Sequence, residues 1–481
     1  MAQAKKSKKP NFILVFCDDI GYGDLGCFGS KKHRTPNIDK MAREGMRFTS
    51  FYSTSGVCTP SRSSLMTGCY PRRVNMHVNE TGRQVLFPGN SRGLHLDEIT
   101  IAELLKDLGY TTGIIGKWHL GDQQQFLPTR QGFDSYFGIP FSNDMGYQPY
   151  PNAKYPPLPL MRNEKVIETE PDQRLLTKRY TQEAIRFITK NKDNPFFLYL
   201  PHSMPHNPVY ASKKFAGKSK NGKYGDAIEE IDWSMGEILR TLKRLGLDEN
   251  TIVLITSDNG ASNRFGGRNF PLRGFKASTW EGGMRVPMVV RWPNHIPAGQ
   301  STDAVTTTMD VLPTFVRIAG GAPPKDRVID GHDIRELLFA KKGAESPYEA
   351  FYCYNRAKLD AVRSGPWKLY VPRKIGRGKR ARTLPWQLFD LKNDIGEAKN
   401  VAKKFPQVVE RLKGYLDKAR IELGDGDLKG KGQRPAGSVT NPKTLTTRPK
   451  KEMSQSQRNP QEKIVASPLA PEKSLLRPNA S

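Results

Sequence analysis

Short apolar runs alternate with amphipathic stretches over the first 345 residues of the chain. The runs are rich in β-branched and aromatic residues, as is typical of buried strands: Phe12–Phe16, Thr111–Ile115, Pro195–Leu200, Thr251–Thr256 and Val286–Arg291. The stretches between them carry apolar residues at helical intervals: Ile38–Gly45, Ile99–Leu108, Arg179–Lys190 and Tyr224–Leu245. This alternation predicts βαβ units and an α/β fold, with a large, mostly parallel sheet covered by helices on both faces.

The pattern changes after about residue 345. Three short runs predict strands, Ala350–Tyr354, Trp367–Val371 and Trp386–Leu391, and residues 406–423 predict a helix. From residue 424 the chain is rich in Gly, Pro, Ser and Lys without periodicity, which is typical of disorder. The predicted organisation is therefore a basic tail (1–10), a large α/β domain (11–345), a small antiparallel α+β domain (346–425) and a basic, disordered tail (426–481).

Polar residues directly follow four of the predicted strands. They form the clusters Asp18-Asp19, Lys117-Trp118-His119, Pro201-His202-Ser203-Met204-Pro205-His206 and Ser257-Asp258-Asn259-Gly260. In an open parallel sheet the carboxyl ends of the strands lie along one edge, and ligands bind there. We therefore expect the four clusters to meet.

The carboxylates of the first and last clusters are candidate metal ligands. Alone, Asp18 and Asp19 are typical of a solvated turn, but Asp258 and Asn259 complete an all-oxygen set with them. Such a set favours a hard cation, Ca²⁺ or Mg²⁺, over zinc. Residues 21–26 match G-x-G-x-x-G, yet no helix is predicted directly after them and the carboxylates would repel a pyrophosphate. We interpret them as a glycine-rich turn beside the metal site.

The third cluster offers candidate proton donors. His202 and His206 are spaced like a helical zinc pair, but neighbouring prolines exclude a regular helix, so both are loop residues. A loop histidine is by default a surface residue, whereas beside a strand end that faces carboxylates it suits proton transfer. Lys117 and His119 project to one side of an extended chain, either toward the same site or as part of a salt-bridged strand end.

The segment Cys58-Thr59-Pro60-Ser61-Arg62-Ser63-Ser64-Leu65-Met66-Thr67-Gly68 predicts a short helix, because Pro is favoured in the first turn and Gly just past the last. Cys58 would then stand at the helix N-terminus, with Arg62 one turn later. A helix N-terminus and an arginine together stabilise an anion, either a thiolate or a tetrahedral oxyanion. By contrast, Cys17 and Cys353 fit the ordinary role of a small buried hydrophobic residue.

Composition and charge exclude several classes of protein. Five cysteines without a C-x-x-C pair exclude a disulfide scaffold and a thiolate zinc site. No apolar stretch approaches the ~18 residues that a membrane span needs, and the lysine-rich start lacks the apolar core of a signal peptide. The formal net charge of +28 attracts polyanions, whether nucleic acid, an anionic lipid surface or a sulfated polysaccharide.

Together the motifs resemble the type I sulfatases of the alkaline-phosphatase superfamily, including their arylsulfatase A-like members. In this family the Cys of a C-x-P-x-R motif is converted to formylglycine after synthesis, and Cys58, Pro60 and Arg62 match that motif. The resemblance covers about residues 10–420. The other motifs follow in family order: Asp18-Asp19, Gly116-Lys117-Trp118-His119, Ser257-Asp258-Asn259-Gly260 and Gly274-Phe275-Lys276 with Glu281-Gly282-Gly283.

The resemblance implies a role for each matching residue. The implied Ca²⁺ ligands are Asp18, Asp19, Asp258 and Asn259, with the modified Cys58 as a further ligand and the nucleophile. The implied sulfate contacts are Arg62, Lys117 and Lys276, together with Ser142 from a variable loop. His206 and Lys276 would protonate the leaving oxygen, and His119 would deprotonate the spare hydroxyl of the hydrated nucleophile.

The implied reaction is the hydrolysis of a sulfate ester. One hydroxyl of hydrated formylglycine attacks sulfur and displaces the alcohol, and proton loss from the other hydroxyl expels sulfate. The substrate would be a sulfated carbohydrate, which the charge of the folded body favours, or an aryl sulfate; maturation would need a formylglycine-generating enzyme. Neither a nucleic acid partner nor a membrane span is expected. The family suggests a periplasmic or extracellular location, while the lack of a signal peptide leaves a cytoplasmic one open.

Two alternatives remain at this point. One is a phosphodiesterase or phosphonate monoester hydrolase of the same superfamily, and the other is a non-catalytic polyanion-binding protein in which Cys58 stays unmodified. A basic run between two predicted strands bears on substrate size: Arg373, Lys374, Arg377, Lys379, Arg380 and Arg382. It is by default a solvated turn, or else it lies beside the cleft and contacts further sulfates of a polymer.

Overall fold

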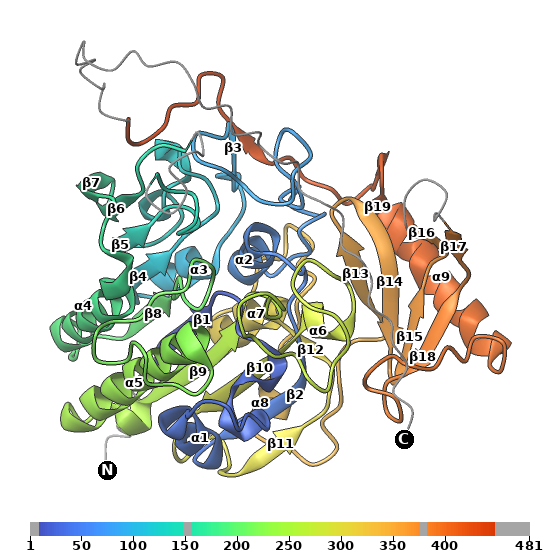
Figure 1. Cartoon of the computed structure of the whole chain (residues 1–481), viewed down its shortest axis with the longest axis horizontal. Helices are drawn as coiled ribbons and strands as arrows, with labels where there is room; N and C mark the ends of the chain where they lie inside the picture. The colour runs from blue at the N-terminus through green and yellow to red at the C-terminus, as the bar shows by residue number, and fades with distance from the viewer. Residues whose placement is uncertain (1–8, 148–154, 376–381, 448–481) are drawn as a thin grey trace, which may run out of the picture. The chain divides into compact units, whose positions relative to one another are not determined.

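A sheet of 11 strands organises the fold (Figure 1). The computed structural model describes residues 9–147, 155–375 and 382–447. The centre of the sheet is parallel, in the order β9 (Thr251–Ser257), β1 (Asn11–Cys17), β8 (Phe196–Leu200), β4 (Thr111–Lys117) and β5 (Ser135–Ile139). Four of these strands were predicted to within two residues, and β5 was not.

Antiparallel pairings extend this parallel centre on both sides. Beyond β9 lie β10 (Arg285–Arg291) and β2 (Met46–Tyr52), and the short strands β11 (Gln300–Thr302) and β12 (Thr306–Thr307) then pair with β2 in parallel. Beyond β5 lies a hairpin of β6 (Pro159–Arg162) and β7 (Lys165–Thr169). The large, mixed and mostly parallel sheet confirms the predicted fold class.

Helices cover both faces of the sheet because the residues of its central strands alternate between two cores. Phe12, Leu14 and Phe16 of β1 pack with one set of helices: α2 (Cys58–Thr67), α3 (Ile101–Asp107) and α7 (Val311–Ile318). Ile13 and Val15 pack with the other set: α1 (Pro36–Arg43), α4 (Leu176–Lys190) and α5 (Gly222–Arg244). A strand buried on both faces is apolar throughout, which is why its run was recognisable in the sequence.

Shorter helices form the connections between these elements. They are α6 (Glu281–Met284), α8 (Arg335–Leu338), and the 3₁₀ turns η1 (Tyr22–Asp24), η2 (Gly26–Phe28), η3 (Gln124–Phe126), η4 (Pro128–Arg130), η5 (Gln173–Leu175), η6 (Asp248–Asn250) and η7 (Thr308–Asp310). The turns η1 and η2 hold the glycine-rich segment, which therefore does not lead into a dinucleotide-binding helix. A Cβ on Gly21 would lie 2.3 Å from the carbonyl oxygen of Arg268, so this turn requires glycine.

The C-terminal part of the chain forms a second, antiparallel sheet. Its strands are β13 (Phe351–Asn355), β14 (Lys358–Ser364), β15 (Trp367–Tyr370) and β18 (Gln387–Asp390), and a hairpin of β16 (Arg373–Ile375) and β17 (Arg382–Leu384) lies between the last two in the chain. Helix α9 (Pro406–Leu423) buries Val409, Leu412 and Leu416 in the same core as Leu369 and Leu388. Figure 1 shows α9 alongside this sheet. The small antiparallel α+β region expected after residue 345 is present.

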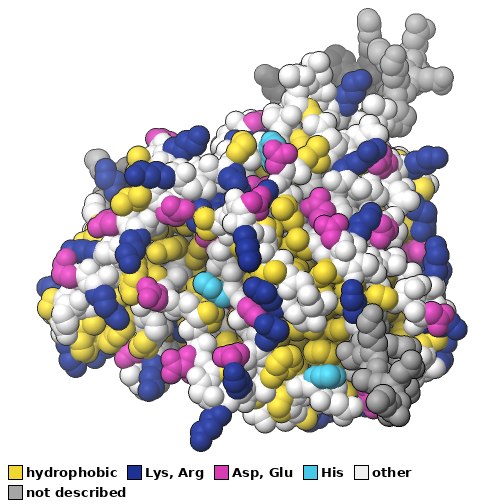
Figure 2. Space-filling view, turned by 180° about the vertical axis from the view of Figure 1, so that it is seen from behind, with side chains coloured by type: hydrophobic (Ala, Val, Ile, Leu, Met, Phe, Trp, Pro, Cys, Tyr) yellow, Lys and Arg dark blue, Asp and Glu magenta, His cyan; other side chains and the backbone are white. Residues whose placement is uncertain are grey.

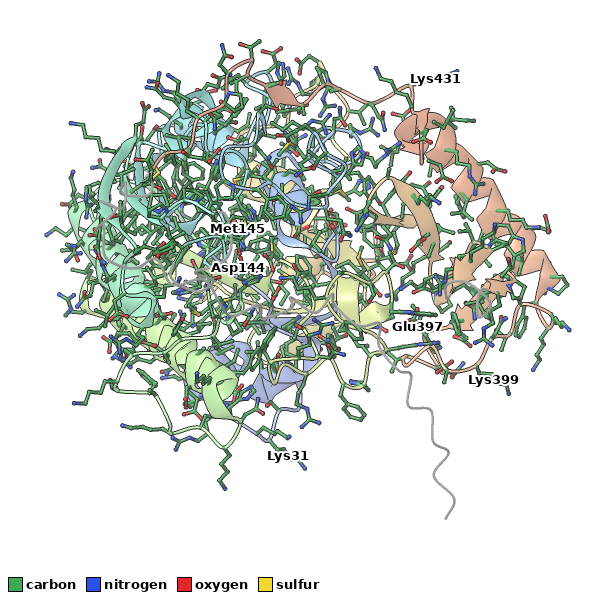
Figure 3. All side chains as sticks on the ribbon, turned by 45° about the horizontal axis from the view of Figure 1, so that its top comes forward. Lys31, Asp144, Met145, Glu397, Lys399 and Lys431 are labelled. Carbon is green, nitrogen blue, oxygen red and sulfur yellow. The ribbon has the colours of Figure 1, made fainter. Side chains whose placement is uncertain are left out.

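Buried charges join the two sheets. Lys368 of β15 lies with its Nζ 2.8 Å from an oxygen of Glu281 and 3.2 Å from an oxygen of Glu397, and all three side chains are buried. Glu397, labelled in Figure 3, lies beside α6 and accepts a 2.8 Å hydrogen bond from the backbone N–H of Glu281. Because each charge has an opposite partner, the cost of burying the charges is compensated only in the assembled pair of sheets.

Residues 424–447 run back across the large sheet's connections. The short strands β19 (Gly424–Asp425) and β20 (Leu428–Lys429) pair with each other, and β21 (Gly437–Ser438) pairs with β3 (Arg92–Gly93). Arg434 forms a bidentate ion pair with Glu98, both N–O distances being 2.8 Å. The prediction of disorder is therefore wrong for residues 426–447, because polar contacts hold a segment whose composition offers few apolar ones. Residues 448–481 lie outside the described part of the chain.

No helix in the described segments is both long and apolar enough to cross a membrane. Figure 2 shows one face of the molecule, on which Lys and Arg side chains are interspersed with Asp and Glu. On this face the positive net charge does not form one solid basic patch.

Candidate active site

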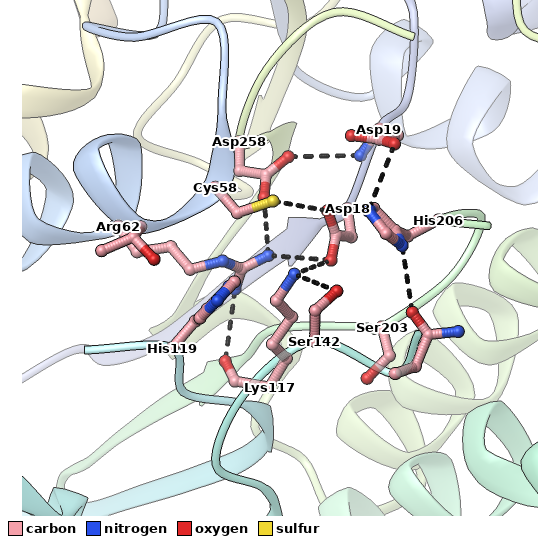
Figure 4. Close-up of polar contacts among 12 residues, drawn as sticks. Asp18, Asp19, Cys58, Arg62, Lys117, His119, Ser142, Ser203, His206 and Asp258 are labelled. Carbon is pink, nitrogen blue, oxygen red and sulfur yellow. Dashed lines mark hydrogen bonds and ion pairs between the residues drawn. The ribbon is translucent and has the colours of Figure 1, made fainter. Parts of the chain in front are cut away.

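The four polar clusters meet at the carboxyl ends of β1, β4, β8 and β9 (Figure 4). Asp18 follows β1, Lys117 ends β4, His206 lies in the loop after β8, and Asp258 follows β9. The backbone N–H of Asp19 donates a 3.2 Å hydrogen bond to Asp258, which ties the ends of β1 and β9 together. The edge of the parallel sheet thus gathers residues that are up to 240 positions apart in the chain.

The acidic residues of the site surround a point that suits a cation. Ligand oxygens of Asp18, Asp19 and Asp258 all lie within 4.8 Å of one another, and the three side chains are buried. Asn259 donates from Nδ2 to Asp19 at 2.6 Å, while its Oδ1 is buried and has no hydrogen-bond partner among the described residues. A bound cation would satisfy both the three carboxylates and the buried oxygen that has no hydrogen-bond partner.

Cys58 begins α2 beside this acidic group. Its Sγ lies 3.5 Å from Oδ1 of Asp18, and the helix ends as expected at Gly68, which has a left-handed φ of 68°. Burial, and then the charge of Asp18, raise the pKa of the Cys58 thiol to about 12. The unmodified side chain is therefore a neutral thiol, so the thiolate considered from the sequence is not favoured.

Three cationic side chains converge on the carboxylates. Nη2 of Arg62 lies 2.8 Å from Asp258, and Nζ of Lys117 contacts Asp18 and is 3.2 Å from Oγ of Ser142. Nζ of Lys276 is 2.7 Å from Asp19 and 3.8 Å from Sγ of Cys58. Burial works to lower the pKa of Lys276, but the neighbouring carboxylates outweigh it and hold the pKa well above its ordinary value. Both lysines and Arg62 are therefore charged.

His206 is oriented by a residue that the sequence reading did not single out. Asn143 donates from Nδ2 to Gln173 at 3.0 Å and to the carbonyl of Pro208 at 3.2 Å, so its Oδ1 is the acceptor for Nδ1 of His206 at 3.1 Å. This leaves Nε2 of His206 facing the site, 3.9 Å from Asp19. Asn143 follows Ser142 directly, and that adjacency was the available signal.

The ring of His119 is fixed in a comparable way. Its Nε2 lies 3.0 Å from the carbonyl oxygen of Leu86, which can only accept, so Nε2 carries the hydrogen and Nδ1 is the free acceptor. Nδ1 is buried and has no hydrogen-bond partner within the described segments. Burial, and then the charge of Lys117, hold the pKa of His119 well below its ordinary value, so the ring is neutral.

Backbone strain is also present at this site. Asp19, His119 and Ala277 have left-handed φ values of 70°, 64° and 66°, which are costly for residues other than glycine. Asp19 and His119 are residues that the resemblance assigns to the site, and Ala277 directly follows Lys276, which is another. The turn that carries Lys276 is also held from the second sheet, because Lys368 donates to the carbonyl of Thr279 at 2.8 Å.

His202 lies apart from this group. Its Nε2 is 3.4 Å from Oγ of Ser234 on α5, and its ring lies beside that of Tyr180 on α4. Of the two histidines considered from the sequence, only His206 therefore reaches the candidate site. His202 is instead a buried histidine whose pKa is lowered by burial from 6.5 to about 4.

This burial makes His202 a source of pH-dependent stability. The unfolded chain binds a proton on His202 below pH 6.5 and the folded chain only below about pH 4, so stability is lost as pH falls through this window. At pH 5 the loss is about 2 kcal/mol. We expect urea unfolding of His202→Gln to show a correspondingly smaller difference between pH 7.5 and pH 5 than the unsubstituted protein. An identical pH dependence of the two proteins would contradict this assignment.

Comparison with known proteins places these features among sulfatases. A family model described as "Sulfatase" matches residues 10–322, and one described as "N-sulphoglucosamine sulphohydrolase, C-terminal" matches residues 275–422. N-acetylgalactosamine-6-sulfatase of Mus musculus is 40% identical over 410 residues, covering 82% of this chain and 76% of that protein. Steryl-sulfatase of Homo sapiens is 37% identical over 450 residues, covering 77% of each. A crystal structure of Ps i-CgsB in complex with k-i-k-neocarrahexaose matches with a TM-score of 0.74 and 33% identity, covering 85% of this chain and 92% of that one.

Proposed function

The chain belongs to the sulfatase family and is a sulfuric ester hydrolase, and we propose that it removes sulfate from a sulfated carbohydrate using a formylglycine made from Cys58 and a bound Ca²⁺. The observation that carries this proposal is the position of Cys58. Its Sγ lies 3.5 Å from a carboxylate of the acidic group and 3.8 Å from the ammonium of Lys276. A nucleophile at position 58 would therefore stand between the metal ligands and the sulfate-binding cations.

The donor set fits a hard cation. Asp18, Asp19 and Asp258 supply oxygens within 4.8 Å of one another, and the unpartnered Oδ1 of Asn259 adds a fourth. Asp18, Cys58 and His206 also come within this distance and would suit zinc, but conversion of Cys58 to formylglycine removes the sulfur and leaves oxygen ligands. Ca²⁺ is accordingly our choice, with Mg²⁺ as the alternative. When bound, the ion supplies positive charge that offsets the carboxylates and polarises oxygen groups.

Arg62, Lys117 and Lys276 would bind the sulfate oxygens, with Ser142 as a hydroxyl donor beside Lys117. Their charged ends lie around Asp18 and Asp19, so they would present fixed donors to an anion at Cys58 without reorganisation. Preorganised charges of this kind act most strongly where water is excluded, and the Arg62 and Lys117 side chains are fully buried.

The two histidines would move protons at defined atoms. His206 would donate from Nε2 to the leaving oxygen, because Asn143 occupies Nδ1, and Lys276 would assist it. His119 would accept a proton at Nδ1, because the carbonyl of Leu86 occupies Nε2. The neutral state of His119 supports its assignment as a base rather than an acid.

Maturation and substrate class complete the proposal. Cys58 is 3% exposed at the start of α2, so a formylglycine-generating enzyme would have to act on this segment before it is packed. Two relatives support a carbohydrate substrate by name or ligand, N-acetylgalactosamine-6-sulfatase and Ps i-CgsB with its neocarrahexaose. Steryl-sulfatase is an equally strong relative, so the relatives alone do not decide the substrate class. We choose a glycan because of the positively charged groove described below.

The test is discrimination between sulfate monoesters and phosphodiesters. A diester carries a second organic substituent on phosphorus, which would have to fit beside Arg62, Lys117 and Ser142, whose side chains are at most 1% exposed. We expect the matured protein to hydrolyse an aryl sulfate roughly 100-fold faster than the matching aryl phosphodiester at equal concentration. Faster turnover of the diester would favour the phosphodiesterase alternative, and turnover of neither, with an aldehyde present at position 58, would contradict the proposal.

A further inference from the structure

Two adjoining hollows form a continuous groove between the turn that follows Lys276 and the second sheet. Their volumes are about 1120 and 760 Å³. They share five lining residues: Ala277, Asn355, Lys358, Asp360 and Gly426. The larger hollow alone exceeds the roughly 300–1,000 Å³ of a pocket for a small ligand, so the groove has room for more than one sugar ring.

The groove begins beside the candidate active site. Ala277 directly follows Lys276, and its backbone N–H donates a 2.7 Å hydrogen bond to the carbonyl of Gly56, two residues before Cys58. The groove is also lined by Gln84, two residues before the Leu86 carbonyl that orients His119. A substrate chain whose reacting group lies at Cys58 can therefore continue into the groove.

Most cations of the groove are already engaged. Arg273 donates to the carbonyl of Glu397 at 2.7 Å, Arg420 pairs with Asp417 at 2.7 Å, and Arg72 donates to carbonyls near the end of α9. Arg373, the first residue of the basic run noted in the sequence, stacks on Trp280 and Tyr370 at 4.7 and 4.3 Å from their ring centres. These side chains build the walls of the groove and are held in place by contacts within the protein.

Three other cations are uncommitted. Arg356, Lys358 and Lys374 are exposed, line the groove, and have no ion pair or hydrogen bond of their side chains within the described ranges. Of the carboxylates that line the groove, Asp425 pairs with Arg420 at 3.2 Å. Asp360, which accepts from the hydroxyl of Thr279 at 2.9 Å, and the exposed Asp427 face the three cations, so the described groove wall holds three free cations against two carboxylates. Arg377, Lys379 and Arg380 of the same basic run lie outside the described residues.

The backbone of Arg356 supports a binding role for the β13–β14 turn. Only two residues connect these strands, and Arg356 has a left-handed φ of 56°, a conformation that favours Gly or Asn in such turns. Within the described segments, no hydrogen bond or ion pair of its side chain accounts for an arginine at this strained position.

We propose that this groove is a secondary anion subsite, in which Arg356, Lys358 and Lys374 bind further sulfate groups of the same sulfated oligosaccharide. This inference rests on the proposed function and adds a substrate class to it: the enzyme selects multiply sulfated glycans over singly sulfated or sterol-like esters. An exposed cation contributes little binding free energy to a single anion in solution. The subsite therefore contributes only when a substrate chain presents a second sulfate while its first sulfate is held at Cys58.

The test compares two triple variants with the same change in charge. The groove variant is Arg356→Gly/Lys358→Ala/Lys374→Ala, in which glycine keeps the left-handed turn. The control is Lys392→Ala/Lys399→Ala/Lys403→Ala, three exposed lysines of the second sheet region that line neither hollow. Inhibition of 4-nitrocatechol sulfate hydrolysis by a carrageenan-derived, multiply sulfated hexasaccharide is measured for each, together with KM for the aryl sulfate.

We expect the inhibition constant to rise about tenfold in the groove variant, to depend less on salt, and to stay unchanged in the control. KM for the aryl sulfate should change less than the inhibition constant in the groove variant and stay unchanged in the control. An inhibition constant that is unchanged in the groove variant, or raised equally in the control, would overturn the subsite while leaving the proposed function intact. Absence of aryl sulfate hydrolysis by the unsubstituted, aldehyde-bearing protein would instead contradict the function.

Discussion

The Cys58→Ala variant is expected to lose sulfate ester hydrolysis by at least about 10⁴-fold in kcat, because removal of a nucleophile leaves only binding and electrostatic effects. Cys58→Ser should retain only a trace, since a hydroxyl side chain cannot be oxidised to the aldehyde by a thiol-specific maturation route. The measurement is turnover of an aryl sulfate by purified protein. The same preparation gives the peptide containing residue 58 for mass analysis, which distinguishes a thiol from an aldehyde.

A matched control is a buried cysteine in the second core. Cys353 is buried like Cys58 but lies in the core of the small sheet, away from the candidate metal ligands. Cys353→Ala should lower the melting temperature and leave turnover per folded molecule unchanged. Near-normal hydrolysis by Cys58→Ala would end the proposal that position 58 is the nucleophile, whatever the mass of its peptide.

Much of the fold was predictable because the central strands are buried on both faces. Their continuous apolar runs, such as Phe12–Phe16 in β1, stand out against the amphipathic helices between them. Strand direction was not predictable in the same way. The run at residues 286–291 was recognised as a strand, but its antiparallel pairing with β9 depends on where the chain returns to the sheet, which periodicity does not record.

The residues of the candidate site were predictable where a motif and a strand end coincide. Asp18, Lys117 and Asp258 each directly follow or end a central strand, and the parallel sheet brings them together. The groups that orient the two site histidines, His206 and His119, were missed for a physical reason. Asn143 and the Leu86 carbonyl act through contacts across 63 and 33 positions, and a backbone carbonyl carries no side-chain signal at all.

The prediction of a disordered tail was wrong for residues 426–447 because composition indicates how much apolar surface a segment can bury but not which polar contacts it forms. Residues 426–447 have little to bury, yet Arg434 pairs with Glu98 across 336 positions and β21 adds to β3. The free cations of the groove were missed in part for a related reason. Arg356 and Lys358 belong to no basic run in the sequence, and only the fold shows that they line the same groove as Lys374, Lys358 being common to both of its hollows.

Exhaustive chelation is expected to abolish activity and to lower the melting temperature together. The ion would offset repulsion among Asp18, Asp19 and Asp258, which are buried within 4.8 Å of one another. An ion that binds only the folded state stabilises that state by about 3 kcal/mol when free Ca²⁺ is 100-fold above its dissociation constant. Calorimetry before and after chelation, with turnover measured on the same samples, gives both quantities, and addition of Ca²⁺ should restore them.

An Asn259→Ala variant separates a metal effect from a general effect of the chelator. It removes the one buried oxygen of the group that has no hydrogen-bond partner in the described structure while keeping all three carboxylates. We expect weaker Ca²⁺ binding and a smaller loss of melting temperature on chelation than in the unsubstituted protein, because less of its stability comes from the ion. An equal loss in both proteins would place the chelated ion elsewhere. Stoichiometric zinc by elemental analysis, without calcium or magnesium, would overturn the all-oxygen site itself, since zinc prefers the sulfur and nitrogen donors that Cys58 and His206 would then have to supply.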